Sequence, residues 1–559
     1  MQTFHLSTKI VRIAIPELIE KNDSFDYKQS RMIKGFRQIA SLTALSRVFG
    51  FIRDIAYSHF FGANALLDAW TIAFKIPNLA RRLFGEGAAS ASFIPVYTEE
   101  LHKNSRHAAQ LINTVVTVLF VLLAAIVLIG QAAIWGYYKF FNPINETKLV
   151  LSLTSIMLPY MLMVCIVAIL AGILNVHKHF AAPAVAPLVL NIFIIGSILL
   201  TGWVFKLQSR QQLFFVAAAV LIAGIVQIAI QVPPLRAAGV SIRPAWQIHS
   251  EAFRKIIILM GPMILGLTVT QINTLADDLI AWWFSGSIEK GEFFLILGRN
   301  IAYPLHRGSV SHLYYAQRLY QLPLGVFGIS LATAIFPVMS ACAARKDSIA
   351  LARTVSQGLC SCLFIAIPAS IGLVAIARPL ISLAFQHGQF AGKDTSKVAW
   401  TLSFYAMGLC GYFAQQLLTR AFYSMQDSKT PVHSALIAVV VNIILNLTLI
   451  WLWGTGGLAC STALCSYLQV LILVVALRKR LGSSIFDGLV PTLMKTIVAA
   501  ICMSAAIAAA LWLSKNCHSI VKLLLVVSSA SAVYLLAAKI LNIEMLSLLT
   551  GRRQPPIEK

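Results

Sequence analysis

Apolar runs of about twenty residues recur along most of this chain of 559 residues. A run of that length can cross about 30 Å of hydrocarbon as a helix, and we count about fourteen such runs. The clearest cover residues 111–137 and 519–541. Only 12% of the residues are charged, whereas a soluble domain carries roughly a quarter. The chain is therefore predicted to be an all-α polytopic membrane protein, which excludes a soluble enzyme, a secreted disulfide scaffold and a disordered chain.

Basic residues exceed acidic residues, with 45 Lys and Arg against 21 Asp and Glu and a formal net charge of +24. In a membrane protein such an excess is typical of cytoplasmic loops and of contact with anionic lipid head groups. No basic soluble domain accompanies it, so we expect no nucleic-acid partner. The basic residues gather in alternate loops, for example at Arg345 and Lys346 and over 478–480, which predicts that both termini lie in the cytoplasm.

Two stretches of the chain are similar to each other. IPNLARRLFGEGAASASFIPVY, near residue 77, and LPLGVFGISLATAIFPVM, near residue 323, both place a Phe-Gly pair between two prolines. HFAAPAVAPLVLNI and SKTPVHSALIAVVVNI form a weaker second pair. Internal repeats of this kind are common in transporters. The alternative is that proline and small residues simply recur in membrane helices.

The repeat predicts two six-helix lobes followed by two further helices. The predicted divisions are a cytoplasmic extension (1–34), an N-lobe (35–234), a C-lobe (252–478) with an extended periplasmic loop (286–310), two C-terminal helices (491–541) and a cytoplasmic tail (542–559). The loop contains the apolar run FFLIL, which indicates an interfacial segment. The nine cysteines have no paired CxxC spacing and are expected to be small buried side chains.

Charged residues occur inside the first predicted helix (35–60). Arg47 lies about twelve residues from either end, too far for its side chain to reach the membrane surface. Gly50 and Asp54 share its face, and Arg53 lies about a third of a turn away. An arginine at this depth costs at least about 2.5–3.5 kcal/mol, which favours a functional role. The alternative is an ion pair of Asp54 with Arg47 or Arg53 that holds helices together.

The second predicted helix carries further charges, namely Asp68, Lys75, Arg81, Arg82 and Glu86. A continuous helix over 64–97 would be about 50 Å long, so we expect it to tilt or to open near Gly85. Arg318 lies near the end of the eighth predicted helix. Guanidinium groups bind phosphate through paired hydrogen bonds, so arginines from several helices indicate an anion with many oxygens. Alternatively, Arg81, Arg82 and Arg318 reach the membrane surface.

A second set of polar residues indicates different chemistry. Asn442 and Asn446 share one helix face, and Asp277 and Asp278 lie in another predicted helix. Carboxylate and amide oxygens on facing helices suit a hard cation such as Na⁺. Hydrogen bonds between helices are an equally good explanation for buried asparagines.

Several longer motifs are distinctive: SRVFGFIRD, DAWTIAFKIPNLARRLFGEGAASASFIPVY, YYAQRLYQLPLGVFGISLATAIFP, FQHGQF and FYSMQDSKTPV. Together they resemble the MurJ (MviN) family of lipid II flippases, within the MOP exporter superfamily. The resemblance covers most of residues 32–545. It implies a MOP or MATE-like transporter of the bacterial inner membrane, not an enzyme. Its cargo would be lipid II, the undecaprenyl-diphosphate-linked peptidoglycan precursor, moved from the cytoplasmic to the periplasmic leaflet.

The resemblance also implies roles for individual residues. The substrate-binding cations would be Arg47, Arg53, Arg81, Arg82, Arg318 and Lys75. Gating or charge pairing would fall to Asp54, Asp68 and Glu86. The nearest equivalents of the Na⁺ ligands held by some members are Asp277, Asp278, Asn442 and Asn446. Gln317 stands where an acidic residue often accompanies the eighth-helix arginine.

The transport mechanism can be stated in physical terms. A diphosphate is too costly to move through hydrocarbon, so a hydrated cationic cavity must replace its solvation and open to one leaflet at a time. We expect no bound cofactor, coupling to Na⁺ or to the membrane potential, lipid II and membrane lipids as partners, and a monomer. The alternatives are a flippase for another polyprenyl-diphosphate-linked oligosaccharide and a MATE-like multidrug exporter, although a cationic drug favours an acidic cavity.

Overall fold

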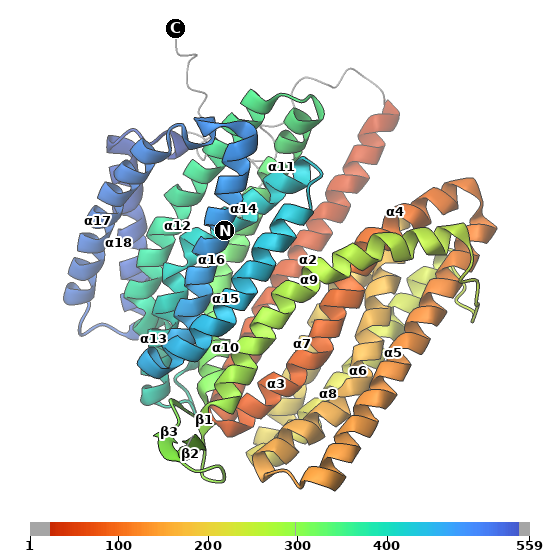
Figure 1. The fold of residues 1–559 in the computed structure, drawn as a ribbon, viewed down its shortest axis with the longest axis horizontal. Coiled ribbons are helices and arrows are strands. Elements are labelled where there is room, and N and C mark those ends of the chain that lie inside the picture. Colours follow the sequence, from red (N-terminus) through yellow and green to blue (C-terminus); the bar gives the residue numbers. More distant parts are fainter. Residues whose placement is uncertain (1–22, 297, 547–559) are drawn as a thin grey trace. The chain divides into compact units, whose positions relative to one another are not determined.

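A computed structural model of the chain describes residues 23–296 and 298–546, with side chains described from residue 41 onward except at 85–91, 262, 265–267, 269, 270 and 296. The predicted extension (1–34) and tail (542–559) therefore lie largely outside the described residues. Helices dominate the fold (Figure 1). Ten of the described helices or helix pairs are long and apolar enough to cross a membrane. The prediction of a polytopic helical membrane protein is confirmed, and the count of fourteen stays a prediction.

The chain divides into two compact units. The N-terminal unit comprises residues 27–314 and 385–394, and the C-terminal unit comprises 315–384 and the chain from residue 395 onward. Residues 251–283, which the sequence placed at the start of the C-lobe, belong to the N-terminal unit because they pack on helices of that unit. The predicted lobes rest on an internal repeat, which this packing does not test.

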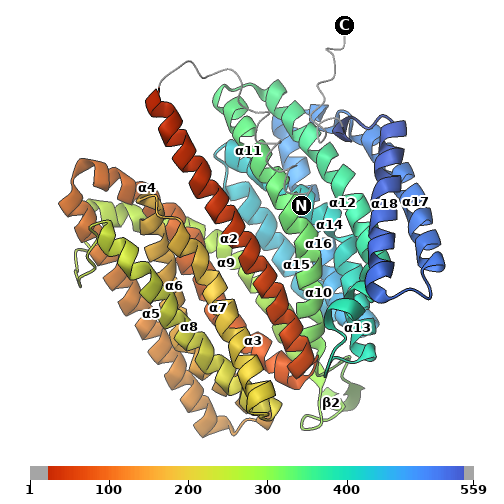
Figure 2. The ribbon, with the colours of Figure 1, turned by 180° about the vertical axis from the view of Figure 1, so that it is seen from behind.

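The N-terminal unit is a bundle of long helices, seen from opposite sides in Figures 1 and 2. Its helices are α2 (Asp23–Phe61), α3 (Ala65–Ala80), α4 (Ala88–Lys103), α5 (Ser105–Phe141), α6 (Asn145–Val176), α7 (Ala181–Leu199), α8 (Ser209–Ala237) and α9 (Glu251–Trp283). Two π-helical segments, Arg81–Gly87 and Leu200–Val204, continue α3 and α7. Helix α6 has a large share of buried side chains because α3, α5 and α8 all pack against it.

The C-terminal unit contains the remaining helices. Helix α10 (Ser309–Pro323) begins in the N-terminal unit and enters this one at Tyr315. The others are α11 (Ile329–Ala344), α12 (Ser348–Phe385), α13 (Gly392–Met407), α14 (Leu409–Ser424), α15 (Lys429–Trp453), α16 (Thr455–Leu481), α17 (Leu489–Leu513) and α18 (Ser519–Ile540). A π-helical segment (Leu324–Gly328) joins α10 to α11, and a short 3₁₀ turn (Ser483–Phe486) precedes α17.

The second predicted helix does not open at Gly85. Helical backbone continues from α3 through Arg81–Gly87 into α4, and the seven residues between the two helices are π-helical. A π segment widens the turn and shifts the helix face, so it absorbs the strain of a long helix without breaking the backbone hydrogen bonding. The predicted site of opening is therefore the site of a π segment.

The predicted interfacial loop forms a small amount of β structure. Strand β2 (Phe293–Ile296) pairs antiparallel with β3 (Arg299–Ala302), and the two-residue strands β1 (Ser285–Gly286) and β4 (Leu305–His306) pair in parallel. Phe294 packs on Phe284 and Tyr303, at ring-centroid distances of 6.3 and 4.7 Å. Its neighbour Phe293 is 58% exposed, as the alternation of side chains along a strand predicts.

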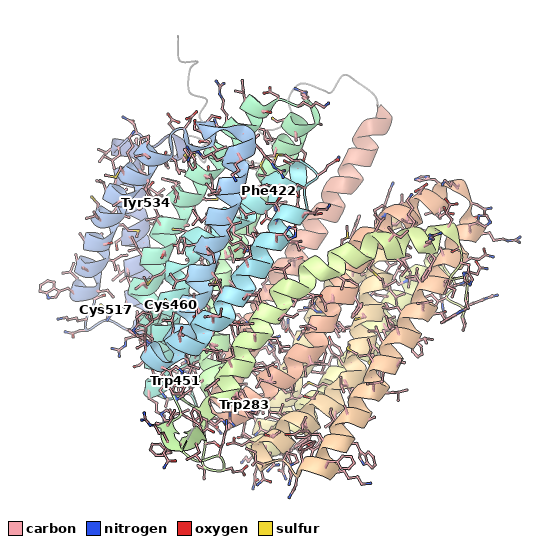
Figure 3. All side chains as sticks on the ribbon, viewed as in Figure 1. Trp283, Phe422, Trp451, Cys460, Cys517 and Tyr534 are labelled. Atoms are coloured by element: carbon pink, nitrogen blue, oxygen red, sulfur yellow. The ribbon has the colours of Figure 1, made fainter. Side chains whose placement is uncertain are left out.

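The last two helices pack on α12 as a pair. Phe364 of α12 lies in one buried cluster with Met503 of α17 and Val526 of α18. The Tyr534 ring of α18 lies 5.4 Å from the Phe364 ring in a tilted arrangement, and its hydroxyl donates to the Phe364 carbonyl at 2.6 Å. Figure 3 labels Tyr534 on this helix pair. The two helices are thus attached to α12 through a buried apolar cluster that includes the Tyr534 contact.

The expectation that the cysteines are buried is wrong for two of them. Cys502 on α17 and Cys517 in the turn before α18 are exposed, whereas Cys165, Cys360 and Cys362 are buried. Figure 3 labels Cys517 at the end of the helix pair. An apolar face of a membrane helix meets lipid instead of protein, so a small apolar residue there need not be buried against protein.

The Asp427 carboxylate, in the loop before α15, caps the first turn of that helix in a pH-dependent way. Its carboxylate accepts from Lys429 N at 2.9 Å, from Thr430 N at 3.0 Å and from Arg480 Nη2 at 2.6 Å. Burial raises the pKa of Asp427, but the hydrogen bonds from Thr430 and Arg480 outweigh it and the net pKa is lowered. A lowered carboxyl pKa stabilises the fold above the unfolded pKa, and this contribution is lost as pH falls through the folded pKa.

We therefore expect acid to loosen the start of α15 in the parent protein more than in an Asp427→Asn variant. Hydrogen exchange of residues 428–432, measured from neutral pH down to below the usual aspartate pKa of about 3.9, checks this. Exchange must be corrected for its intrinsic pH dependence. An equal loss of protection in both proteins on acidification would contradict the assignment.

Candidate functional site

Arg53 of α2 lies at the centre of a buried polar cluster in the N-terminal unit. Its Nε and Nη2 donate to Asp54 Oδ1 at 3.1 and 2.8 Å, and its Nη1 donates to Asn191 Oδ1 of α7 at 3.0 Å. The Tyr314 hydroxyl of α10 donates to Asp54 Oδ1 at 2.6 Å and accepts from Arg53 Nη2 at 3.3 Å. Arg53 is 8% exposed and Asp54 is 3% exposed. One paired charge therefore joins α2, α7 and α10.

The geometry of this cluster favours the structural alternative for Arg53. A guanidinium has five N–H groups, and four hydrogen bonds join this one to a carboxylate, an amide and a phenol. The Tyr57 ring also lies 5.6 Å from the guanidinium carbon. Asn191 is fixed in turn, because its Nδ2 donates to the Ser46 carbonyl at 3.2 Å. In this structure Arg53 holds helices together, and its predicted binding of substrate stays a prediction.

Two other predicted cations of the same unit have exposed side chains. Arg47 lies on α2, and its side chain makes no hydrogen bond or ion pair within the part of the chain that is described. Arg82 lies in the π-helical segment after α3, and its Nη1 donates to Gln271 Oε1 of α9 at 2.9 Å. A guanidinium presents its N–H groups as a planar fork that matches two phosphate oxygens. Exposed arginines such as these can bind phosphate without breaking a buried ion pair.

Lys75 of α3 pairs with an acidic residue that the sequence assigned to a metal site. Its ammonium group forms a salt bridge with the Asp278 carboxylate of α9 and donates to the Thr274 carbonyl at 2.8 Å. Asp278 is 2% exposed. Lys75 therefore neutralises a buried carboxylate and connects α3 to α9.

Asp68 of α3 caps the start of α10. Its two carboxylate oxygens accept from the backbone N–H of Gly308 at 2.6 Å and from the backbone N–H and hydroxyl of Ser311 at 2.7 and 2.6 Å. Asp68 is fully buried. The first N–H groups of a helix have no partner within the helix and carry partial positive charge, so a carboxylate there satisfies and stabilises them. This contact places the first turn of α10 against α3.

We expect Asp68→Ala to weaken the first turn of α10, because buried N–H groups would lose their acceptor at a cost of about 1–3 kcal/mol. Hydrogen exchange at residues 309–313 should become faster, while exchange in α18, far along the chain, should not change. Asp68→Asn keeps one acceptor oxygen and should lie between the parent and Asp68→Ala. Unchanged protection of these residues in Asp68→Ala would contradict the capping role.

The remaining predicted charged residues are Arg81, Arg318 and Glu86. Arg81 is half-buried beside Arg82, and Arg318 is half-buried on the part of α10 that belongs to the C-terminal unit. The side chain of Glu86 lies outside the described residues. Gln317, which stands where an acid was expected, donates to the Tyr405 hydroxyl at 3.1 Å. The predicted cations are thus distributed over both units.

The asparagine pair of α15 forms hydrogen bonds with its own surroundings. Asn442 and Asn446 are fully buried, Asn446 Nδ2 donates to Asn442 Oδ1 at 2.9 Å, and Asn442 Nδ2 lies 3.5 Å from Thr462 Oγ1 of α16. Asp277 and Asp278 belong to the N-terminal unit, and Asp278 is paired with Lys75. Hard cations need several oxygen ligands, commonly about six. The contact of Asn442 with Thr462 fits the interhelical alternative, and a Na⁺ site at these residues stays a prediction.

The sequence gave no role for three of the residues in these contacts. Tyr314 and Asn191 reach Asp54 and Arg53 from positions 260 and 138 residues away along the chain. The Ser311 N–H donates to Asp68, which lies 243 residues earlier in the chain. The repeated stretch HFAAPAVAPLVLNI includes Asn191, but the repeat gave no role for this residue. Contacts of this kind depend on helix packing, so they need the tertiary structure.

Comparison with known proteins adds a family to this geometry. The family model described as "Lipid II flippase MurJ" matches residues 57–529. The chain belongs to the MurJ family. A relative from Vibrio cholerae, named a probable lipid II flippase MurJ, is 33% identical over 460 residues, which are 79% of this chain and 82% of the relative. A Burkholderia cenocepacia protein, named a lipid II flippase MurJ, is 29% identical over 80% of this chain and 84% of its own length.

Solved structures support the same fold. A structure titled as lipid II flippase MurJ in an inward closed conformation has a TM-score of 0.72 at 24% identity and covers 91% of this chain and 99% of that chain. An inward-facing multidrug resistance MATE transporter of the MOP superfamily has a TM-score of 0.60 at 12% identity, covering 80% and 98%. The predicted MOP or MATE-like fold is confirmed. The MurJ family is one of lipid flippases, so the chain is a multi-pass protein of the bacterial inner membrane and not an enzyme.

Proposed function

We propose that this chain flips lipid II from the cytoplasmic to the periplasmic leaflet by alternating access through a cationic cavity. Membership of the MurJ family supports the choice of cargo. The observation that carries the rest is a division among the cations of the N-terminal unit. Arg53 and Lys75 are paired with buried carboxylates, whereas Arg47 and Arg82 are exposed. The paired cations organise the helices, and the exposed arginines bind the diphosphate.

The division follows from the cost of moving charge within a membrane. A substrate that displaced Asp54 from Arg53 would leave a buried carboxylate without its cation, at a cost of several kcal/mol. An exposed arginine exchanges water for phosphate instead, and its hydrogen bonds to the anion are strengthened by charge. Binding by Arg47 and Arg82 therefore captures the head group without dismantling the bundle, while the lipid tail stays in the bilayer.

The exposed arginines also bear on the rival cargo. A cationic drug would meet like charge at Arg47 and Arg82, which opposes its binding. A diphosphate-linked lipid carries the complementary charge. The cation pattern therefore favours a diphosphate cargo over a cationic drug, and leaves lipid II to be distinguished from other polyprenyl-diphosphate cargo by experiment.

Release on the periplasmic side needs a source of free energy, for which we propose the membrane potential. Moving one negative charge outward across a membrane whose inside is negative releases about 2.3 kcal/mol per 100 mV. The diphosphate carries that charge itself, so no bound ion is required. Both termini would lie in the cytoplasm and the functional unit would be a monomer, as the sequence predicts.

The direct test measures the leaflet in which lipid II resides. Cells depleted of their own flippase, and given only this chain, are treated with an external enzyme or label that reaches periplasmic lipid II alone. We expect restored labelling with this chain and none with an empty vector. Labelling that stays at the level of the empty vector, with the chain present in the membrane, would refute lipid II as the cargo. A second arm collapses the membrane potential, which should abolish labelling.

A further inference from the structure

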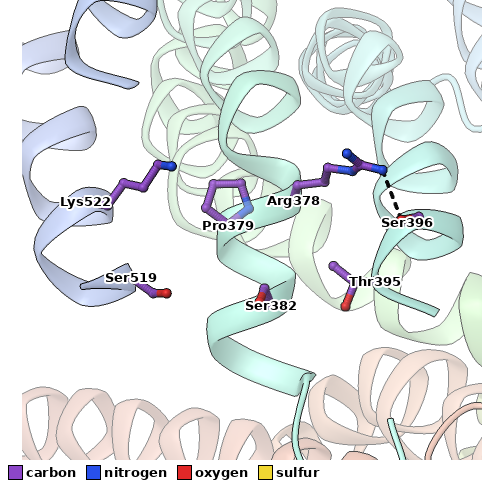
Figure 4. Close-up of a pocket in the computed structure, with 7 residues that line it drawn as sticks. All are labelled: Arg378, Pro379, Ser382, Thr395, Ser396, Ser519 and Lys522. Carbon is purple, nitrogen blue, oxygen red and sulfur yellow. Dashed lines mark hydrogen bonds between the residues drawn. The ribbon is translucent and has the colours of Figure 1, made fainter. Parts of the chain in front are cut away.

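The C-terminal unit contains a cavity whose lining residues have no part in the proposed transport. It has a volume of about 450 Å³ and is lined by Arg378, Pro379, Ser382, Thr395, Ser396, Ser519 and Lys522. These residues come from the end of α12, the start of α13 and the start of α18. Figure 4 shows the α12 residues between α18 on one side and α13 on the other.

The lining is cationic and rich in hydroxyl groups. Arg378 Nη2 donates to Ser396 Oγ at 3.1 Å, which orients the guanidinium and leaves further N–H groups for a ligand. Lys522 is half-buried, and its side chain makes no hydrogen bond or ion pair within the described ranges 23–296 and 298–546. Lys522 extends from α18 toward Pro379, and Arg378 extends from α12 toward Ser396 (Figure 4). The lining residues include no carboxylate. Such a set suits an anion with several oxygen acceptors.

The depth of the cavity matches that of lipid phosphate groups. Helix α12 has 38 residues and is about 57 Å long, so it exceeds the hydrocarbon core and its ends reach the head-group layers. Arg378 lies about 10 Å from the end of α12, and Lys522 lies about 5 Å from the start of α18. Both charges thus lie within a few ångströms of the membrane surface rather than at mid-membrane.

The surface beside Lys522 is apolar and faces outward. Val521 is 46% exposed and Leu524 is 66% exposed. At the end of α17, Trp512 is 67% exposed, and tryptophan is enriched at the membrane interface. A ligand bound at Lys522 would therefore have its polar group in the cavity and lipid-facing side chains next to it. A free phosphate ion makes no use of this apolar surface, whereas a phospholipid does.

We propose that this cavity binds the phosphate group of an anionic phospholipid, with its acyl chains lying along the exposed face of α18. Arg378 and Lys522 hold the phosphate, and the serine and threonine hydroxyls complete its hydrogen bonds. With the predicted orientation of the termini, the lipid belongs to the periplasmic leaflet. The site would attach the last two helices to α12 through a lipid, in addition to the Tyr534 contact.

The test is lipid retention measured by native mass spectrometry of the full chain, with phosphatidylglycerol as the probe. Lys522→Met keeps the length of the side chain and removes its charge. Loss of one charge-assisted hydrogen bond should weaken apparent affinity about tenfold. Lys539→Met is the matched control, since Lys539 lies in the last turn of the same helix. It should bind phosphatidylglycerol like the parent.

Two further measurements keep the result interpretable. The melting temperature of each variant in detergent must match that of the parent, and Arg378→Gln provides a second neutral variant from a different helix. Inorganic phosphate should compete poorly with phosphatidylglycerol. Equal lipid binding by the parent, Lys522→Met and Arg378→Gln would overturn the site. Displacement of the lipid by inorganic phosphate at equal concentration would overturn the lipid assignment and leave a free-anion site.

Discussion

Replacement of Arg47 with glutamine is expected to prevent this chain from supporting growth of cells that lack another lipid II flippase. Arg47 is exposed on α2 and makes no ion pair with described residues, so its loss removes a phosphate ligand without leaving a buried charge unpaired. Hydrogen bonds that involve a charged group contribute about 1.5–3 kcal/mol, which corresponds to roughly a 10- to 100-fold loss of affinity for the diphosphate. Growth rate and periplasmic lipid II accessibility measure the effect.

The abundance of the variant in the membrane separates loss of transport from loss of protein. Arg106→Gln is the matched control, because Arg106 is also an exposed arginine of the N-terminal unit and lies at the start of α5. It should support growth normally. Full complementation by Arg47→Gln, at the abundance of the parent, would remove Arg47 from the mechanism.

Arg53→Gln is expected to act through stability instead. The substitution leaves the Asp54 carboxylate, which is 3% exposed, with its Tyr314 hydrogen bond and without its cation. Breaking a buried ion pair by removing one partner costs about 3–5 kcal/mol. We expect a lower melting temperature in detergent and reduced abundance in the membrane, both of which Arg47→Gln should leave near the parent value.

The double variant Arg53→Gln with Asp54→Asn distinguishes the two roles of Arg53. Removing both charges of a buried pair is far less costly than removing one, so the double variant should recover much of the lost stability. Recovery of both stability and growth fits a structural role. Recovery of stability without growth would show that Arg53 contacts the substrate, as the family resemblance implies, and would contradict the division of the cations proposed above.

The sequence predicts the class of this fold well because bilayer thickness leaves few alternatives. Long apolar runs must be helices in lipid, since each backbone polar group has to be satisfied within its own segment. The fine structure of the helices is less predictable. The stretch around Gly85 was expected to open, and the chain forms a π-helical segment there. Glycine permits either irregularity, so the sequence does not distinguish them.

The site was predictable in its residue types but not in its pairings. The sequence pointed to Asp54, Arg53 and Arg47 and left open which arginine pairs with the carboxylate. The choice depends on Asn191 and Tyr314, which complete the hydrogen bonds of Arg53 from other helices. Asp278 was assigned to a cation site because carboxylate and amide oxygens on facing helices suit a hard cation. In the structure it is paired with Lys75. The sequence shows a carboxylate inside a predicted membrane helix, and only the tertiary structure shows which cation pairs with it.

The small β structure illustrates the same limit. FFLIL in the 286–310 loop was expected to lie at the interface as an apolar segment. It supplies strand β2, whose alternate side chains pack inward at Phe294 and point outward at Phe293, and its place at the interface stays a prediction. The apolar run alone does not show that it forms a strand, which depends on pairing with Arg299–Ala302.

The central claim is that the exposed arginines of the N-terminal unit bind the diphosphate of lipid II. Native mass spectrometry of purified protein with lipid II tests it directly, by comparing the parent with an Arg47→Gln, Arg82→Gln double variant of matched melting temperature. For the double variant, we expect the lipid II-bound fraction to fall to near the background seen with an uncharged polyprenyl alcohol. A double variant that binds lipid II as tightly as the parent would contradict it.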